Sequence, residues 1–188
     1  MIISSKLIRA ALVCVAKNDV RYYLCGLHIT PNYIEATNGH VALRMEHGIK
    51  TKKNIIVHFE GIVPAKAETT ELIFNKEPIA IHRDQFQRRL SITGIKLLDG
   101  RFPDLERVIP KKLDLSIQPV IQARYLTYPE KMFGRGRTFI PVQLRPSSDG
   151  GAVRIHFDSV INATYGNPQF VVMPCLDDAF KVVEEHLG

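Results

Sequence analysis

The chain has 188 residues, a length that suits one sizeable domain or about one and a half small ones. Apolar residues make up 45% and charged residues 23%, and no apolar run approaches the roughly 18 residues that suggest a membrane span, so we expect no membrane association. The net charge of +6 favours partners with phosphate backbones, although many moderately basic chains are simply soluble proteins.

Residues 2–17 are interpreted as a helix of a mature, cytoplasmic protein. The segment superficially resembles a signal peptide, but Lys6 and Arg9 interrupt it and no small-residue cleavage site follows. Ser4 or Ser5 is expected to cap the helix. One face is apolar, and Lys6, Arg9 and Lys17 lie on the other side. That basic face is either solvated or lies near the phosphates of a duplex, and composition does not separate the two.

The stretch from residue 18 to residue 44 predicts an antiparallel meander. Strands are expected at Val20–Leu27, Tyr33–Ala36 and Val41–Met45. Asn38-Gly39 separates the second strand from the third, and Asn-Gly is the strongest short-range signal of a hairpin.

A second group of strands is expected between residues 54 and 98, at Asn54–Phe59, Leu72–Asn75, Ile79–His82 and Ile95–Leu98. Residues 60–70 have room for a short helix at most. Between the last two strands, Arg83, Arg88 and Arg89 lie close together. This cluster is either a solvated turn or a contact for phosphates.

Prolines mark the main boundary, which we place near residue 112. Beyond it we expect a strand at Leu115–Val120 and a short helix at Ala123–Phe133, limited by Pro129. A flexible basic loop then carries Arg135 and Arg137. Further strands are expected at Phe139–Arg145, Val153–Phe157 and Phe170–Met173, and a last amphipathic helix at Asp177–Leu187. Helices and antiparallel strands together predict an α+β fold.

Nothing in the sequence favours catalysis. The polar candidates are His40, His82, Asp84, Asp99 and Asp104, but none belongs to a known catalytic, nucleotide-binding or metal-ligand motif. The three cysteines, Cys14, Cys25 and Cys175, have no CxxC spacing and sit among apolar neighbours. We therefore predict a protein that is not an enzyme and has neither a metal nor a cofactor.

Three stretches, in order along the chain, resemble the bacterial DNA polymerase III beta subunits, the sliding clamps. They are DVRYYLCG with ATNGHVAL (19–26 and 36–43), DGRFPDLERVIP (99–110) and FVVMPCL (170–176). The resemblance implies a DNA-clamp fold of antiparallel sheets with a few helices packed on one side, built from helix-and-sheet units. Residues 1–112 resemble the middle domain and 113–176 part of the C-terminal domain, while 177–188 is an added helix. The second helix of the middle domain is shortened or lost here.

The resemblance also implies a groove that takes a short, extended peptide ending in Leu or Phe. The positions that match the groove of the family are Leu24, Thr37, Gly39, His40, Pro103, Arg107, Val108, Val171, Met173, Pro174 and Cys175. The chain departs from the family where Val41-Ala42 replaces Arg-Leu and where Cys175 replaces Met. Either the groove is retained with a different wall, or these residues are only the core of an inherited fold.

Two functions follow from the resemblance. The first is a sliding-clamp-like, non-catalytic processivity factor that binds duplex DNA non-specifically and tethers a DNA polymerase. A clamp loader is a possible further partner, and the chain would assemble into a homo-oligomeric ring. The alternative is a truncated clamp relative that binds clamp-interaction peptides as a regulator or decoy without encircling DNA. The basic residues expected to contact DNA are Lys6, Arg9, Lys17, Arg88, Arg89, Arg135 and Arg137.

Overall fold

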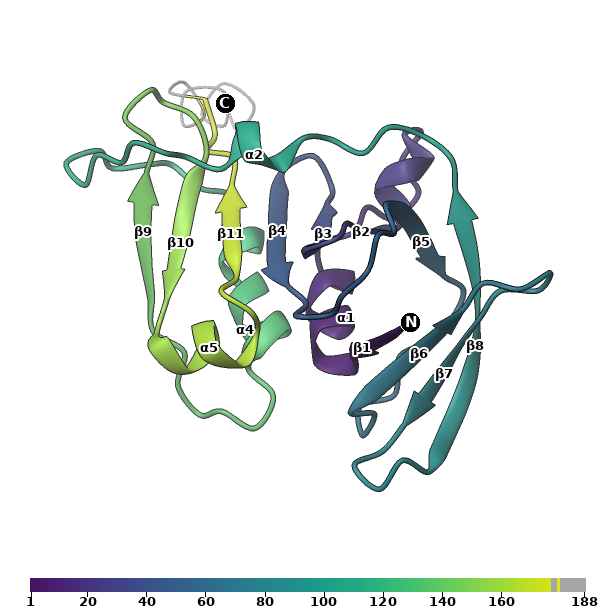
Figure 1. The fold of residues 1–188 in the computed structure, drawn as a ribbon. Helices are drawn as coiled ribbons and strands as arrows, with labels where there is room; N and C mark the ends of the chain where they lie inside the picture. Colours follow the sequence, from purple (N-terminus) through teal and green to yellow (C-terminus); the bar gives the residue numbers. More distant parts are fainter. Residues whose placement is uncertain (177–178, 180–188) are drawn as a thin grey trace, which may run out of the picture.

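The computed structural model describes residues 1–176 and residue 179, so the helix predicted at Asp177–Leu187 lies outside the described residues. In the described part, eleven strands form one antiparallel sheet (Figure 1). From edge to edge the strands are β1 (Ile2–Ser4), β6 (Thr69–Ile73), β7 (Ile79–Arg83), β8 (Arg89–Leu98), β5 (Ile55–Phe59), β2 (Leu27–Ile29), β3 (Tyr33–Thr37), β4 (Val41–Glu46), β11 (Gln169–Val172), β10 (Val153–Phe157) and β9 (Val142–Pro146). The predicted α+β class with antiparallel sheets is confirmed.

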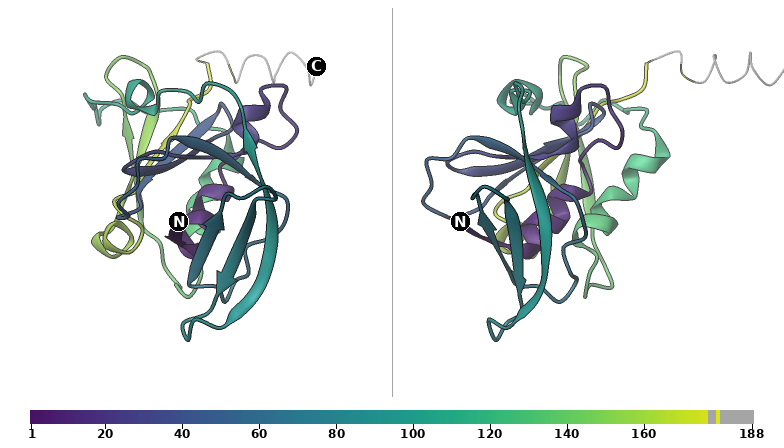
Figure 2. Two further views of the ribbon diagram at one scale, coloured as in Figure 1. Left: turned by 45° about the vertical axis from the view of Figure 1, so that its right-hand side comes forward. Right: turned by 90° about the vertical axis from the view of Figure 1, so that its right-hand side faces the viewer.

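The long strand β8 joins the two halves of this sheet. Its residues 89–94 pair with β7, whereas its residues 95–98 pair with β5. Helix α1 (Ser5–Leu12) contacts β1 and β6 in one half and β2, β3 and β4 in the other. The sheet therefore curves around α1, as the turned views in Figure 2 show.

Helix α1 packs against a second helix, α4 (Tyr128–Phe133), which follows the short helix α3 (Ala123–Leu126). The apolar spacing of α1 buries Leu7, Ile8, Ala10 and Ala11 against the sheet. Helix α4 carries Pro129 in its first turn, where the missing N–H of proline breaks no helical hydrogen bond. The two helices and the concave face of the sheet enclose the main apolar core.

Two predicted elements near the N-terminus differ from the structure: the helix predicted over residues 2–17 is present but shorter, and the strand that follows it is wrong. Residues 2–4 form a strand, because Ile2 and its neighbours pair with β6, and α1 ends at Leu12, so that Lys17 lies in a loop. The strand predicted at Val20–Leu27 is a 3₁₀ helix, Tyr22–Cys25, followed by β2. The cause is local: the carboxylate of Asp19 accepts the N–H of Arg21 at 2.8 Å and starts a turn.

Beyond residue 112, the strand predicted at Leu115–Val120 is absent from the described residues, and the side chain of Leu115 is exposed. The helix α5 (Ser159–Thr164) was not predicted. Asp158 caps it, because its carboxylate accepts the N–H of Ile161 at 2.9 Å. The strand predicted at Val153–Phe157 is present as β10 with the predicted ends, and the other predicted strands are present with shifted ends. Strand β8 begins at Arg89, earlier than predicted.

The segments before and after residue 112 share one sheet and one core. Strand β4 pairs with β11, so that Ala42 lies opposite Val171. Phe133 and Phe170 pack in the same apolar cluster as Ile8. The short helix α2 (Leu105–Val108) lies in the connection between the two segments. Among the described residues, no helix combines the length and apolar character that crossing a membrane requires.

Candidate functional site

The turn between β3 and β4 forms one side of the candidate site. The Oδ1 atom of Asn38 accepts the N–H groups of His40 and Val41, both at 3.0 Å. The hydroxyl of Thr37 donates to the carbonyl of Val41 at 2.6 Å and accepts the N–H of Gly39 at 3.1 Å. Gly39 has a φ of +87°, a backbone conformation that favours glycine. These contacts fix the turn in one geometry and leave His40 exposed at its tip.

The 3₁₀ helix Tyr22–Cys25 brings an apolar and a basic group to this turn. Leu24 is 1% exposed and faces inward. Arg21 lies directly over Gly39, where an added Cβ would meet the Arg21 Nη2 at 3.0 Å. The carboxylate of Asp19 holds the Arg21 guanidinium at 2.9 Å. Arg21 was not among the predicted site residues, although it belongs to the same RYYL stretch as Leu24.

The connection around α2 closes the second side. Asp104 caps α2 by accepting the N–H of Glu106 at 3.1 Å. The Arg44 guanidinium, from β4, donates to Glu106 on α2 at 2.8 Å and to the buried Glu35 at 2.6 Å. Burial alone would lower the pKa of Arg44, but its hydrogen bonds to the two carboxylates outweigh burial, so the pKa is raised. Arg44 thus ties α2 to the sheet.

The end of β11 completes the site. Val171 is 1% exposed, and Met173, just past the strand, is 43% exposed. The N–H of Met173 donates to the carbonyl of His40 at 2.8 Å, so the chain leaving β11 runs beside the β3–β4 turn. This contact joins segments that lie more than 130 positions apart along the sequence.

These four elements surround a small pocket of about 260 Å³, which we call the β4–β11 pocket. Eight predicted groove residues line it: Leu24, Thr37, Gly39, His40, Pro103, Val108, Val171 and Met173. Four further residues line it that were not predicted: Arg21, Val41, Ala42 and Leu105. The pocket has an apolar floor and a rim that carries an imidazole and a guanidinium.

Three predicted groove residues lie outside the lining of this pocket. The Arg107 side chain is 84% exposed and pairs with Asp104 at 3.2 Å. Arg107 instead lines an adjoining hollow of about 790 Å³, which shares Val108 and Met173 with the pocket and extends to the turn 147–151. Pro174 and Cys175 follow Met173, and the N–H of Cys175 donates to the carbonyl of Val120 at 2.8 Å.

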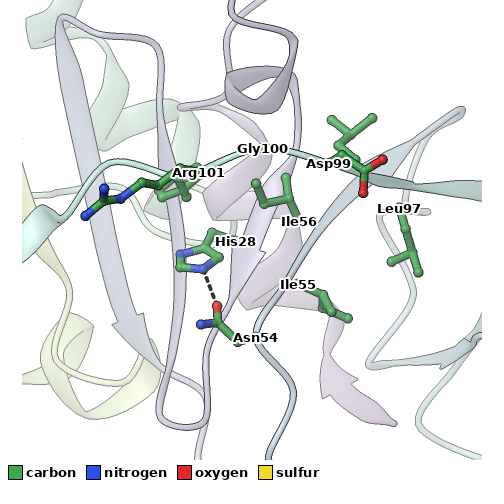
Figure 3. Close-up of a pocket in the computed structure, with 10 residues that line it drawn as sticks. His28, Asn54, Ile55, Ile56, Leu97, Asp99, Gly100 and Arg101 are labelled. Carbon is green, nitrogen blue, oxygen red and sulfur yellow. Dashed lines mark hydrogen bonds between the residues drawn. The ribbon is translucent and has the colours of Figure 1, made fainter.

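A further hollow of about 580 Å³ lies beside β2 and β5 (Figure 3). None of the predicted groove or DNA-binding residues lines it, although Asp99, one of the polar candidates for catalysis, does. In it His28 lies 2.6 Å from the Oδ1 of Asn54, and its other ring nitrogen lies 2.8 Å from Glu35. The imidazole also stacks on Phe102, with ring centroids 4.6 Å apart. Every polar atom of this ring has a partner within the fold, which is typical of a structural histidine.

Four of the basic residues expected to contact DNA come together. Lys6, Arg9, Arg88 and Arg135, with Lys66, line a cleft of about 520 Å³ that we call the basic cleft. It lies between α1, the segment 65–68, the β7–β8 turn and the loop after α4. The other three do not line it: Lys17 is exposed in the loop after α1, Arg89 is exposed on β8, and Arg137 pairs with Asp158 at 2.8 Å.

The polar residues considered for catalysis do not converge. His40 stacks on Tyr125, with ring centroids 5.9 Å apart. His82 is fully buried between the hydroxyls of Thr70 and Thr93, at 2.9 Å and 3.0 Å. Asp84 is bound to Arg88 at 2.8 Å. Within the described residues, no group of three histidines, cysteines or carboxylates is placed to hold a metal ion.

No protein-family model matches the sequence, and no curated protein matches it either. Solved structures do. A DNA polymerase sliding clamp from Pseudomonas aeruginosa is 17% identical and has a TM-score of 0.55 over 94% of this chain and 66% of its own. A DNA polymerase III subunit beta from Borrelia burgdorferi, in complex with a natural product, is 13% identical with a TM-score of 0.63 over 94% and 64%. The beta chain from Streptococcus pneumoniae is 12% identical with a TM-score of 0.61 over the same shares.

At these identities the likeness establishes the fold, which is that of the bacterial DNA polymerase III beta sliding clamps. The fold that the sequence resemblance implied is therefore confirmed. The chain spans less than two thirds of the length of the clamps it matches.

Proposed function

We propose that this chain is a non-catalytic, clamp-like accessory factor of DNA replication that associates with duplex DNA and tethers a DNA polymerase through the β4–β11 pocket. The observation that carries the proposal is the convergence of eight predicted groove residues, from four separate stretches of sequence, on one pocket of a sliding-clamp fold. Tethering acts through effective concentration, because a partner held near its template rebinds instead of diffusing away.

The chemistry of the pocket suits a peptide with an apolar end. Leu24 and Val171 supply a fixed apolar floor, and Met173 supplies a deformable, half-exposed wall. His40 and Arg21, on the rim, offer polar groups that orient a peptide backbone. A volume of about 260 Å³ takes only a few side chains, so the partner is expected to present a short motif.

The DNA-binding part of the proposal rests on charge. The chain carries a net charge of +6, and Lys17, Arg88 and Arg89 are exposed. Contacts between such groups and phosphates release counterions, so the affinity for duplex DNA is expected to fall steeply with salt. An affinity that does not change with salt would contradict this part.

The alternative is a clamp relative that binds clamp-interaction peptides, as a regulator or decoy, without encircling DNA. It is favoured by the β4–β11 pocket itself, because the residues that line the pocket all come from one chain and need no ring to be brought together. The two functions differ in assembly, so light scattering separates them. A closed homo-oligomer supports the first, and a monomer that still binds peptide supports the alternative.

The pocket is tested with a matched pair of variants, Met173→Asp and Val142→Asp. The two side chains are 43% and 44% exposed, but Val142 lies on β9, away from the pocket. The probe is a labelled peptide ending in Leu-Phe, followed by fluorescence anisotropy. Met173→Asp is expected to weaken peptide binding at least about tenfold, because it places a charge in an apolar site. Equal binding by both variants would refute the assignment of the pocket.

A further inference from the structure

The basic cleft carries an excess of positive charge that the fold does not neutralise. Its lining contains the five cationic side chains Lys6, Arg9, Lys66, Arg88 and Arg135 and the two carboxylates Glu68 and Asp84. Asp84 is already occupied, since it accepts the Arg88 side chain at 2.8 Å and the N–H groups of Phe86 and Arg88 at 2.9 Å. Glu68 is the other carboxylate of the lining, and its charge acts on Arg9 and raises the pKa of that guanidinium, so the five cations outnumber the two carboxylates by three.

Two of the cations are held side by side on the same loop. Arg9 Nη1 donates to the carbonyls of Pro64 and Ala67 at 2.8 Å and 2.9 Å, and Arg135 donates to the carbonyl of Ala65. Neither guanidinium forms an ion pair within the described residues. Burial and, next to it, the charge of Arg135 lower the pKa of Arg9, and the charge of Glu68 offsets only part of this. A pair of like charges fixed in this way favours a bound anion between them.

An exposed aromatic ring stands at the rim of the same cleft. Phe86 is 67% exposed in the β7–β8 turn, with the guanidinium of Arg88 5.0 Å from its ring centroid. Inside the cleft, the Lys6 ammonium lies 5.9 Å from the ring centroid of Tyr165. Cations that follow a phosphate backbone, combined with aromatic rings on which bases stack, are the features of single-strand binding sites.

We propose that the basic cleft binds single-stranded nucleic acid, with phosphates at Arg9 and Arg135 and a base stacked on Phe86. Bases in a duplex are stacked on their neighbours and present no face to a ring at a cleft rim, so the occupant is a single strand. This inference goes beyond the proposed function, which concerns duplex DNA and a peptide. The cleft shares Lys6, Arg9, Arg88 and Arg135 with the predicted DNA-binding set, so the test compares single-stranded with duplex DNA.

The experiment measures binding of the full chain to three labelled probes of about 12 nucleotides, a length within the range of single-strand sites. The probes are an oligo-dT strand, a duplex, and a strand of abasic deoxyribose phosphates. The variants are Phe86→Ala and, as a matched control, Phe139→Ala, whose ring is 73% exposed and lies outside the cleft. Base–aromatic stacking predicts that Phe86→Ala weakens oligo-dT binding roughly 5- to 150-fold.

The same substitution is expected to leave the abasic strand, the duplex and the Leu-Phe peptide unaffected, and Phe139→Ala is expected to change nothing. Arg135→Ala is expected to weaken both single strands, because it removes a phosphate contact. Equal loss with Phe86→Ala for oligo-dT and the abasic strand, or no loss, would overturn the proposal. Inorganic tripolyphosphate is added as a competitor to the wild-type chain. Displacement of the abasic strand, with oligo-dT still bound, supports the proposal. If the wild-type chain binds oligo-dT but binds no duplex at any salt concentration, the result contradicts the proposed function and leaves the single-strand proposal standing.

Discussion

Arg44 is expected to contribute more to stability than any other charged side chain of the described residues, because it neutralises a buried carboxylate. Glu35 is 3% exposed, and Arg44 donates to it at 2.6 Å from the neighbouring strand. Arg44→Met keeps an unbranched chain beside the Tyr33 ring, which the guanidinium now covers at 4.8 Å. The variant removes the charge, however, and leaves the Glu35 carboxylate buried with only His28 as a partner.

The magnitude follows from the environments of the two carboxylates that Arg44 binds. Removing one partner of a buried ion pair costs about 3–5 kcal/mol, because the other charge stays desolvated. The Glu106 side chain is 60% exposed, and an exposed pair is worth about 1 kcal/mol at most. Arg44→Met is therefore expected to lower the free energy of unfolding by about 3–5 kcal/mol, and Glu106→Gln by about 1 kcal/mol or less.

Urea unfolding at equilibrium, followed by circular dichroism, measures both values. The double variant Arg44→Met with Glu35→Gln removes the stranded charge, so it is expected to be more stable than Arg44→Met alone. A double-mutant cycle isolates this coupling. A loss below about 1 kcal/mol for Arg44→Met, or strict additivity in the cycle, would refute the argument that Glu35 is a buried charge in need of a partner.

Two further predictions concern stability. Gly166→Ala is expected to cost about 3 kcal/mol or more, because Gly166 has a φ of +62° and an added Cβ would lie 1.9 Å from the Glu46 carbonyl oxygen. Gly48 has a similar φ of +67°, but an added Cβ there would meet no atom within 4 Å. Gly48→Ala is therefore expected to lower the free energy of unfolding, measured in urea, by only about 1–2 kcal/mol. Equal losses for the two variants would contradict the clash at Gly166. Burial lowers the pKa of His82 in the folded state, so the unfolded state binds a proton at a higher pH than the folded state does. The free energy of unfolding is therefore expected to be highest above about pH 6.5 and to decrease as the pH falls from there towards the pKa of the folded state. Urea unfolding from about pH 8 to about pH 5 should show a shallower slope for His82→Asn, and an unchanged slope would count against this.

The sequence predicted correctly the turns whose geometry is set by side chains within the turn itself. The Asn38-Gly39 turn forms because the Asn side chain and a glycine with φ +87° satisfy the hairpin by themselves. The strand predicted at Val20–Leu27 fails for an equally local reason, the turn that Asp19 starts. Alternating apolar residues indicate a strand only where no side chain competes for the backbone. Helix α5 was missed, although Asp158 is a residue type that favours the N-cap position and does cap the helix.

The candidate sites were predictable only to the extent that sequence resemblance marked their residues. The β4–β11 pocket depends on the pairing of β4 with β11, which no local pattern encodes. Arg21 enters that pocket because the 3₁₀ helix turns its side chain over Gly39. The basic cleft was visible only as scattered cations, since Lys6, Phe86 and Arg135 meet through the curvature of the sheet around α1.

The arrangement of the two surfaces bears on how a tether works. The β4–β11 pocket and the basic cleft have no lining residue in common. The pocket is built on the β3–β4 turn, α2 and the end of β11, whereas the cleft is built on α1, the β7–β8 turn and the loop after α4. The cleft elements pack on the main core, whereas Leu24, Leu105 and Val171 of the pocket belong to a second apolar cluster. Strands β4 and β11 contribute side chains to both clusters and so connect the two sites. Under the two proposals, a peptide and a nucleic acid strand would compete for no side chain. Occupation of both sites at once would then be the condition under which effective concentration holds a polymerase at its template.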